Sequence, residues 1–257
     1  MSSNLLESQP QRQKVNYIRD ANNLYVINTK SMGTRLAYYY IEQPTGKSLR
    51  DIIVENFTPF SAWYLNMCKD VFQEYNEVYN PQYLKECFER SLHQSTTFDQ
   101  LDQRFIDQYT REFLIADDYL SEIGISLKMF GPCVNTGNYV ESIALVENTG
   151  NEDFLALWTY LTSGRSLKND APFLEEDYEI RVGFLNRDEH KKLKYYLENY
   201  IGRDIQAIRD KYWTSEEKMI WQQGGSAGSS IASGAELVLK ALNELNEKDV
   251  EVITLID

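Results

Sequence analysis

The sequence predicts an α+β fold that is helix-rich with a small mixed sheet. Hydrophobic residues make up 42% of the 257 residues and aromatic residues 13%, which is enough apolar material for a substantial core. Apolar residues recur at helical spacing over about residues 46–118. The β-prone runs at residues 34–41 and 250–256, which lie far apart in the sequence, are expected in the sheet. We therefore expect a flexible N-terminal arm at residues 1–22 and a single α+β domain over residues 23–257.

The first elements are short. Leu24 to Ile27 and Met32 to Ile41 are β-prone runs, and a Pro-Thr-Gly turn follows at residues 44–46. Ser48 is placed to cap a helix that extends to Phe57.

The helical block follows. Pro59 suits the first turn of a longer helix, a second helix fits residues 81–93, and Thr97 with Gln100 forms a capping-box pattern for a third. The core face of the first helix is marked by Phe60, Tyr64, Met67, Val71, Tyr75 and Val78, and that of the third by Leu101, Phe105, Tyr109 and Phe113.

The second half mixes strands and helices. Residues 123–130 and 139–146 are β-prone runs, and the Gly-Pro-rich segment between them predicts a hairpin. A short helix is expected at residues 154–161, and Asn186 with Glu189 opens another that Gly202 ends. After a Gly/Ser run at residues 224–234, Ser233 and Glu236 form a second capping box, for a helix that extends to Leu245.

The charge balance restricts the partners. The chain has 39 acidic and 26 basic residues, a net charge of −13, which argues against nucleic acid because phosphates need a basic surface. Cys68, Cys87 and Cys133 are widely spaced, as expected of thiols in a reducing compartment. No apolar run approaches the roughly 18 residues of a membrane span, and the N-terminus lacks the pattern of a secretion signal. These features predict a cytoplasmic protein that does not bind a membrane.

Enzymatic motifs are incomplete. Gly224–Gly228 matches G-x-S-x-G, but both histidines, His93 and His190, precede Ser226, whereas the hydrolase pattern needs a histidine after the serine. The Gly-rich backbone before a helix is also a possible phosphate cradle, although no basic residue lies near it. The alternative enzyme site therefore consists of Ser226, Gly228, His93 and His190.

Two further motifs are partial. The segment at residues 45–48 resembles the end of a phosphate-binding loop, but Ile41 stands where the pattern needs glycine. Glu89 and His93 are one helical turn apart, and Asp188 precedes His190, yet helix-terminus electrostatics also account for the acidic residue there. We expect no metal and no cofactor.

Protein binding is the remaining class. Acidic side chains share a helix face opposite the apolar stripe, and aromatic residues beside carboxylates are typical of protein-binding surfaces. The candidate binding residues are Tyr38, Tyr39, Tyr40, Asp70, Glu74 and Glu77. Tyr195 and Tyr196 and the four tryptophans add further aromatic area.

Three segments of the chain carry a resemblance to a known family. They are the Met-Gly start and aromatic strand at residues 32–41, the helix at residues 153–164, and Gly183–Leu185 before the Asn186-capped helix. Together they resemble the YfbM-like family of bacterial proteins of unknown function. Phe154 stands at that family's tryptophan position, and Leu157 or Trp158 replaces its histidine. The resemblance implies an α+β fold and supplies no catalytic residues.

These observations favour a non-enzymatic, acidic, cytoplasmic binding protein. An immunity or inhibitor protein that caps a basic partner protein fits best, because an acidic surface orients and accelerates such docking. The alternative is a hydrolase or phosphate-handling enzyme that uses the loop at residues 224–234.

Overall fold

The computed structural model describes residues 16–19, 25–28, 35–42, 46–71, 86, 88–89, 97–135, 142–143, 145–174, 180–204, 231–245 and 248–256. The chain divides into two compact units, Met1–Gly33 and Thr34–Asp257. The predicted domain boundary after residue 22 therefore lies inside the first unit.

The first unit contains a two-stranded antiparallel sheet. Strand β1 (Asn16–Arg19) pairs with β2 (Tyr25–Asn28), with Asn16 opposite Asn28. The β-prone run predicted at residues 24–27 corresponds to β2, whereas β1 lies in the segment predicted as an arm. The other residues of that arm lie outside the described part of the chain.

The second unit is built on a four-stranded sheet in the order β4-β3-β6-β5. The strands are β3 (Arg35–Glu42), β4 (Ser126–Asn135), β5 (Arg181–Leu185) and β6 (Val252–Ile256). Every described strand pair in it is antiparallel, so the predicted mixed sheet is wrong in this respect. The helix-rich α+β class is confirmed.

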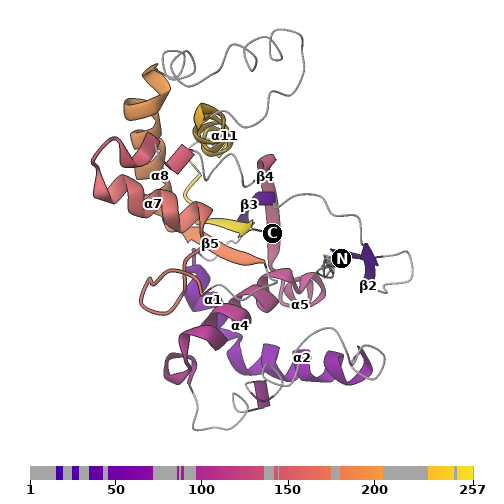
Figure 1. The fold of residues 1–257 in the computed structure, drawn as a ribbon. Helices are drawn as coiled ribbons and strands as arrows, with labels where there is room; N and C mark the ends of the chain where they lie inside the picture. Colours follow the sequence, from indigo (N-terminus) through magenta and orange to yellow (C-terminus); the bar gives the residue numbers. More distant parts are fainter. Residues whose placement is uncertain are drawn as a thin grey trace, which may run out of the picture. The chain divides into compact units, whose positions relative to one another are not determined.

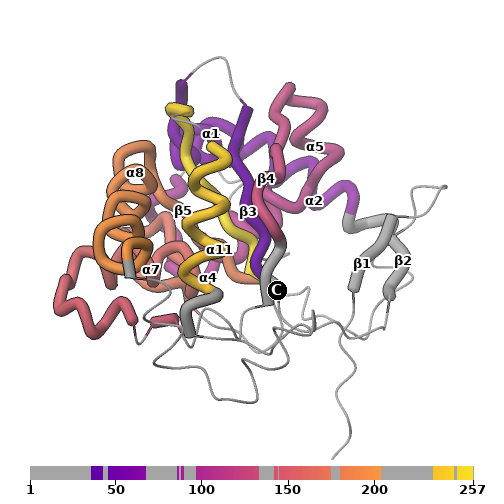
Figure 2. Tube along the Cα trace, turned by 90° about the horizontal axis from the view of Figure 1, so that it is seen from above, coloured from indigo at the N-terminus to yellow at the C-terminus, as the bar shows by residue number. Residues whose placement is uncertain are grey.

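Helices cover both faces of this sheet (Figure 1). The first helical layer contains α1 (Leu49–Glu55), α2 (Phe57–Val71), α4 (Gln103–Ile115) and α5 (Asp117–Glu122). The second helical layer contains α7 (Glu152–Thr162), α8 (Arg187–Tyr196) and α11 (Ile231–Glu244), and α11 lies against β4 (Figure 2).

Alternation along the strands divides the apolar residues between two cores. Val252 and Ile256 of β6 belong to the core under the second layer, whereas Ile253 lies in the core under the first layer. This is the two-residue period expected of a sheet that is covered on both faces.

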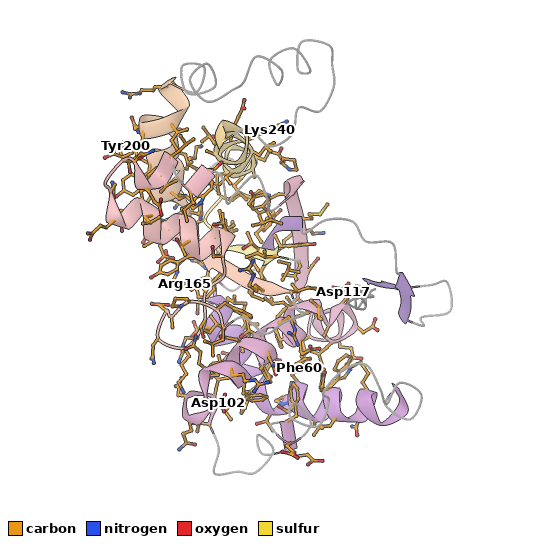
Figure 3. All side chains as sticks on the ribbon, in the orientation of Figure 1. Phe60, Asp102, Asp117, Arg165, Tyr200 and Lys240 are labelled. Atoms are coloured by element: carbon orange, nitrogen blue, oxygen red, sulfur yellow. The ribbon has the colours of Figure 1, made fainter. Side chains whose placement is uncertain are left out.

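The first core is unusually aromatic. Phe60 of α2 is fully buried at its centre (Figure 3) and meets Tyr109 and Phe113 edge-on, each with ring centroids 5.2 Å apart. Such edge-to-face pairs are favourable beyond the apolar area that they bury. The core-face residues predicted for α4 are all buried, as is Tyr64 of α2.

Helix starts follow the predicted caps in two places. Ser48 and Asp51 form a reciprocal capping box at α1, and Asn186 and Glu189 form one at α8. Both caps satisfy backbone N–H groups that the first turn leaves without helical partners.

The predicted capping box of Thr97 and Gln100 is confirmed, with the Thr97 amide donating to Gln100 Oε1 over 2.8 Å, but it opens the 3-10 turn η1 (Phe98–Gln100). The α-helix that was expected to begin there, α4, is capped by Asp102. The predicted cap at Ser233 is wrong. Ser233 lies inside α11, which already includes Ile231. Near this end of α11, the Ala235 amide donates to Ser142 Oγ, which comes from a distant segment.

The hairpin predicted at residues 123–146 is also wrong. Residues 126–135 form one strand, β4, that continues through Gly131 and Pro132, and the described residues from 142 to 147 are helical. Gly131 has a φ of 66°, and the register with β3 shifts around it, as in a β-bulge. Proline is tolerated because β4 is at the edge of the sheet.

Candidate functional site

The tyrosine triplet of β3 is divided between the two faces of the sheet. Tyr38 is 0% exposed and belongs to the second core, so the prediction that it lines a binding surface is wrong. Tyr39 is half-buried against the first core. Tyr40 is also half-buried, and Lys248 Nζ donates to its hydroxyl over 2.7 Å.

The predicted acidic face of the helical block is only partly described. The backbone of Asp70 lies in α2, but the description does not extend to its side chain. Glu74 and Glu77 lie outside the described residues. Their assignment to a binding surface stays a prediction.

Of the four residues of the alternative enzyme site, the structure describes only His190. Ser226, Gly228 and His93 lie outside the described residues, whereas His190 is 3% exposed in α8. Burial lowers the pKa of His190, and its Nδ1 atom has no hydrogen-bond partner among the described residues. The imidazole is therefore held inside the second layer in its neutral form.

The segment that resembles a phosphate-binding loop has structural roles. The Ser48 hydroxyl accepts from the Asp51 amide in the α1 cap, and Lys47 pairs with Glu55 at 2.5 Å. Both groups that would contact a phosphate are thus bonded within α1 and its cap.

A surface patch with exposed tyrosines forms where the start of α7 meets the end of α8. We call it the tyrosine patch. Tyr195 and Tyr200 are 59% and 46% exposed, among the most exposed large apolar side chains described. Tyr200 is labelled in Figure 3. The patch consists of Asp153, Phe154, Lys192, Tyr195, Tyr196 and Tyr200.

Ring contacts hold the patch together. The buried Phe154 ring is stacked on Tyr200 at 6.0 Å and lies 5.5 Å from Tyr196, and Tyr196 lies 6.0 Å from Tyr195. Phe154 therefore anchors the exposed rings to the core beneath them. Rigid aromatic rings of this kind lose little side-chain entropy when a partner covers them.

A π-helical turn positions Tyr200. The turn η2 (Leu197–Ile201) continues α8 and leads into the 3-10 turn η3 (Gly202–Asp204), and it buries Leu197 and Ile201. A π turn holds one residue more than an α turn, which changes the direction of the side chains after it. Tyr200 consequently faces Tyr196 across 5.9 Å. Gly202 was predicted to end this helix. In the structure the π turn ends at Ile201, and Gly202 is the first residue of the 3-10 turn η3.

One carboxylate organises the charges of the patch. Asp153 Oδ2 accepts from Lys192 Nζ at 2.7 Å and from the Tyr196 hydroxyl at 2.6 Å. The bonds from Lys192 and Tyr196 both lower the pKa of Asp153, because they stabilise the carboxylate. The hydrogen bond to Asp153 raises the pKa of Tyr196, because it stabilises the neutral phenol. Asp153 is therefore ionised at neutral pH beside exposed rings.

The sequence carries a signal for this patch. Aromatic residues occur at 195, 196 and 200, and an acidic residue directly precedes Phe154 in the neighbouring helix. What the sequence does not show is that α7 and α8 lie side by side, which brings these residues together.

A buried arginine lies in the loop between α7 and β5, after the end of α7 that is opposite to the patch; its label stands lower in Figure 3 than that of Tyr200. Arg165 is 5% exposed, and its guanidinium pairs with Glu189 at 2.7 Å and with Asp170 at 3.0 Å. Its backbone amide donates to Val182 O, so the loop also covers part of the edge of β5.

Comparisons of the chain with known protein families, with curated proteins and with solved structures found no match. Within the described part of the chain, no helix is both long and apolar enough to cross a membrane. The same described residues contain no cluster of three or more His, Cys, Asp and Glu side chains arranged to hold a metal ion.

Proposed function

We propose that this chain is a non-enzymatic binding protein that docks a basic surface of another protein against the tyrosine patch. The observation that carries the proposal is the exposure of Tyr195 and Tyr200 beside the ionised carboxylate of Asp153. Tyrosine is enriched at the energetic centres of protein interfaces, because it buries apolar area and keeps a polar tip.

The sign of the charge supports a basic partner. The chain carries a net charge of −13, so its field attracts a positively charged protein from a distance and speeds encounter. The exposed faces of the tyrosine rings also favour cations, through the negative potential of the aromatic face.

Three more specific proposals rest on the sequence alone. We propose that the protein acts as an immunity or inhibitor protein, and that it is cytoplasmic because its three cysteines are widely spaced. We also propose that its resemblance to the YfbM-like family reflects a relationship. The enzyme alternative depends on Ser226, Gly228 and His93, which lie outside the described part of the chain, and it stays a prediction.

Site-specific photo-crosslinking tests the proposal. A benzophenone amino acid replaces Tyr195, and in a control protein it replaces Met129, which is equally exposed at 59% but lies on β4. In an extract of the cells that make the protein, we expect position 195 to capture a basic protein that position 129 does not. Its yield should fall as salt is raised from about 50 mM to about 500 mM, because salt screens the steering field.

A second variant then tests whether the captured protein contacts the ring of Tyr200. Tyr200→Ala should weaken binding of the captured protein at least about 10-fold, as expected for an aromatic residue near the centre of an interface. Equal capture from both positions, an acidic captured protein, or binding that is insensitive to Tyr200→Ala would contradict the proposal.

A further inference from the structure

The buried Arg165 lies between aromatic rings and carboxylates of this chain. The guanidinium carbon of Arg165 lies 4.2 Å from the ring centroid of Tyr160 and 4.6 Å from that of Phe184. Two carboxylates, Glu189 and Asp170, complete its surroundings. A planar guanidinium suits this arrangement, because it stacks on rings with its faces and donates hydrogen bonds with its edge.

The tyrosine patch has the same components on the surface, but with a lysine as the cation. Lys192 Nζ lies 2.7 Å from Asp153 and 5.9 Å from the ring centroid of Tyr196. The second distance is at the outer limit of a cation–π contact, which extends to about 6 Å. The ammonium of Lys192 therefore forms a close ion pair with Asp153 but only a weak cation–π contact with Tyr196.

The patch also retains unused capacity. Both hydrogen bonds that Asp153 accepts from the described residues end on Oδ2, and a carboxylate has acceptor sites on both oxygens. Tyr195 and Tyr200 each leave about half of their surface to solvent. An additional donor with a flat apolar face therefore has both a carboxylate oxygen and ring surface to contact.

We infer that the tyrosine patch binds an arginine side chain of the basic partner, which displaces Lys192 from Asp153 and stacks on the exposed tyrosines. This inference rests on the proposed function and specifies its partner. Displacement costs little, because the side chain of Lys192 is 51% exposed and ion pairs between solvent-exposed groups contribute little to stability. The arginine gains two edge donors for Asp153 and the ring contacts that the lysine lacks.

Two small peptides test the inference without knowledge of the partner. Tri-arginine amide and tri-lysine amide are titrated into the full chain, and the ring signals of Tyr195 and Tyr200 are followed by NMR. We expect tri-arginine to bind at least about 3-fold more tightly than tri-lysine and to shift the ring signals of both tyrosines. Of the two cations, only the guanidinium group can stack on a ring and also donate two parallel hydrogen bonds to a carboxylate. Equal binding of the two peptides would overturn the inference.

Two variants separate the carboxylate from its resident lysine. Asp153→Asn should weaken tri-arginine binding about 5-fold, because it removes the charge that the guanidinium pairs with. Lys192→Gln should strengthen it about 2-fold, because the competing cation is gone. Asp188→Asn is the matched control: it removes an exposed carboxylate from the same helix, α8, and should change binding by less than either variant.

The outcomes distinguish this inference from the proposed function. If Lys192→Gln weakens binding or leaves it unchanged, Lys192 does not compete for the site and the inference fails. If the captured protein binds the patch equally well after its arginines are replaced by lysines, the inference fails while the proposed function stands. If tri-arginine behaves as expected but position 195 captures no basic protein, the proposed function fails while the arginine site stands.

Discussion

Gly183 of β5 allows α7 to approach the sheet closely. A Cβ atom at this position would lie 2.4 Å from Thr254 Oγ1 and 2.5 Å from the carbonyl oxygen of Tyr160. Since one of these neighbours is backbone, the helix or the strand would have to shift. Gly183→Ala should therefore lower the free energy of unfolding by about 3 kcal/mol in urea denaturation.

Gly124→Ala is the control for this substitution. Gly124 has a φ of 72°, but its Cβ would meet no atom within 4 Å, so only backbone strain of about 1 kcal/mol is expected. If the two variants lose equal stability, close approach of α7 is not the reason for glycine at 183.

His190 provides a pH dependence of known sign. Burial lowers its pKa below the ordinary value of 6.5, with Lys191 acting in the same direction, so the unfolded chain binds this proton more readily. The contribution of His190 to stability should be fully present above pH 6.5 and should be lost as the pH falls toward the folded-state pKa. His190→Gln should show a flatter decline than the wild type between about pH 7.5 and 5 in urea denaturation.

The comparison with the variant is needed because two buried acids act in the opposite sense. Burial raises the pKa values of Asp107 and Glu251, so both favour the folded state increasingly as the pH falls. Their contribution is common to both proteins and cancels in the difference. Identical pH profiles for the wild type and His190→Gln would show that the folded protein does not disfavour the protonated imidazole, which would contradict the prediction.

At the scale of elements, the loop between α7 and β5 contains a tight turn. Asn169 and Asp170 have φ values of 60° and 54°, and the Ala171 amide donates to Lys168 O. Two successive residues at positive φ are typical of a type I′ turn, which asparagine and glycine accept and β-branched residues do not. Asn169→Val should lower the free energy of unfolding by about 1–2 kcal/mol, whereas Asn169→Gly should change it by no more than about 0.5 kcal/mol.

Thermal denaturation of the two variants measures this difference. Because residue 169 is exposed, neither substitution removes a packed side chain. Equal melting temperatures for valine and glycine would contradict the turn assignment.

The accuracy of the element predictions depended on whether the deciding contacts were local. The cap of α8 is formed by Asn186 and Glu189, three residues apart, and it was predictable. The start of α11 involves Ser142, and the continuation of β4 through Pro132 depends on its place at the sheet edge. Neither contact is visible in a local pattern, so the hairpin at 123–146 and the cap at Ser233 were predicted wrongly.

The tyrosine patch shows the same division at the scale of the whole molecule. Its residue types were recognised in the sequence at Tyr195 and Tyr196, but their partners on α7 are about 40 residues away, as with Asp153 and Tyr196. Tyr38, in contrast, occupies a strand that is covered by helices on both faces and is therefore buried. Exposure depends on layer arrangement, which the sequence alone left undetermined.

The shared sheet should make residues 34–257 unfold as one cooperative unit. Adjacent residues of β6, such as Val252 and Ile253, belong to opposite cores, so neither helical layer keeps its core if the sheet opens. Phe60→Ala in the first core should cost about 3–5 kcal/mol and Leu193→Ala in the second about 2–5 kcal/mol. Each variant should nevertheless show a single transition, at a lower temperature than the wild type.

Calorimetry, together with near- and far-ultraviolet circular dichroism, measures this cooperativity. The near-ultraviolet signal reports the packing of aromatic side chains in both cores, such as Tyr109 in the first and Trp158 in the second, whereas the far-ultraviolet signal reports helices of both layers. Val54→Ala, at an exposed position of α1, should change stability by no more than about 0.5 kcal/mol. If Phe60→Ala separates the near-ultraviolet transition from the far-ultraviolet one, or splits the calorimetric transition into two, unfolding is not a single cooperative event and the sheet does not couple the two cores.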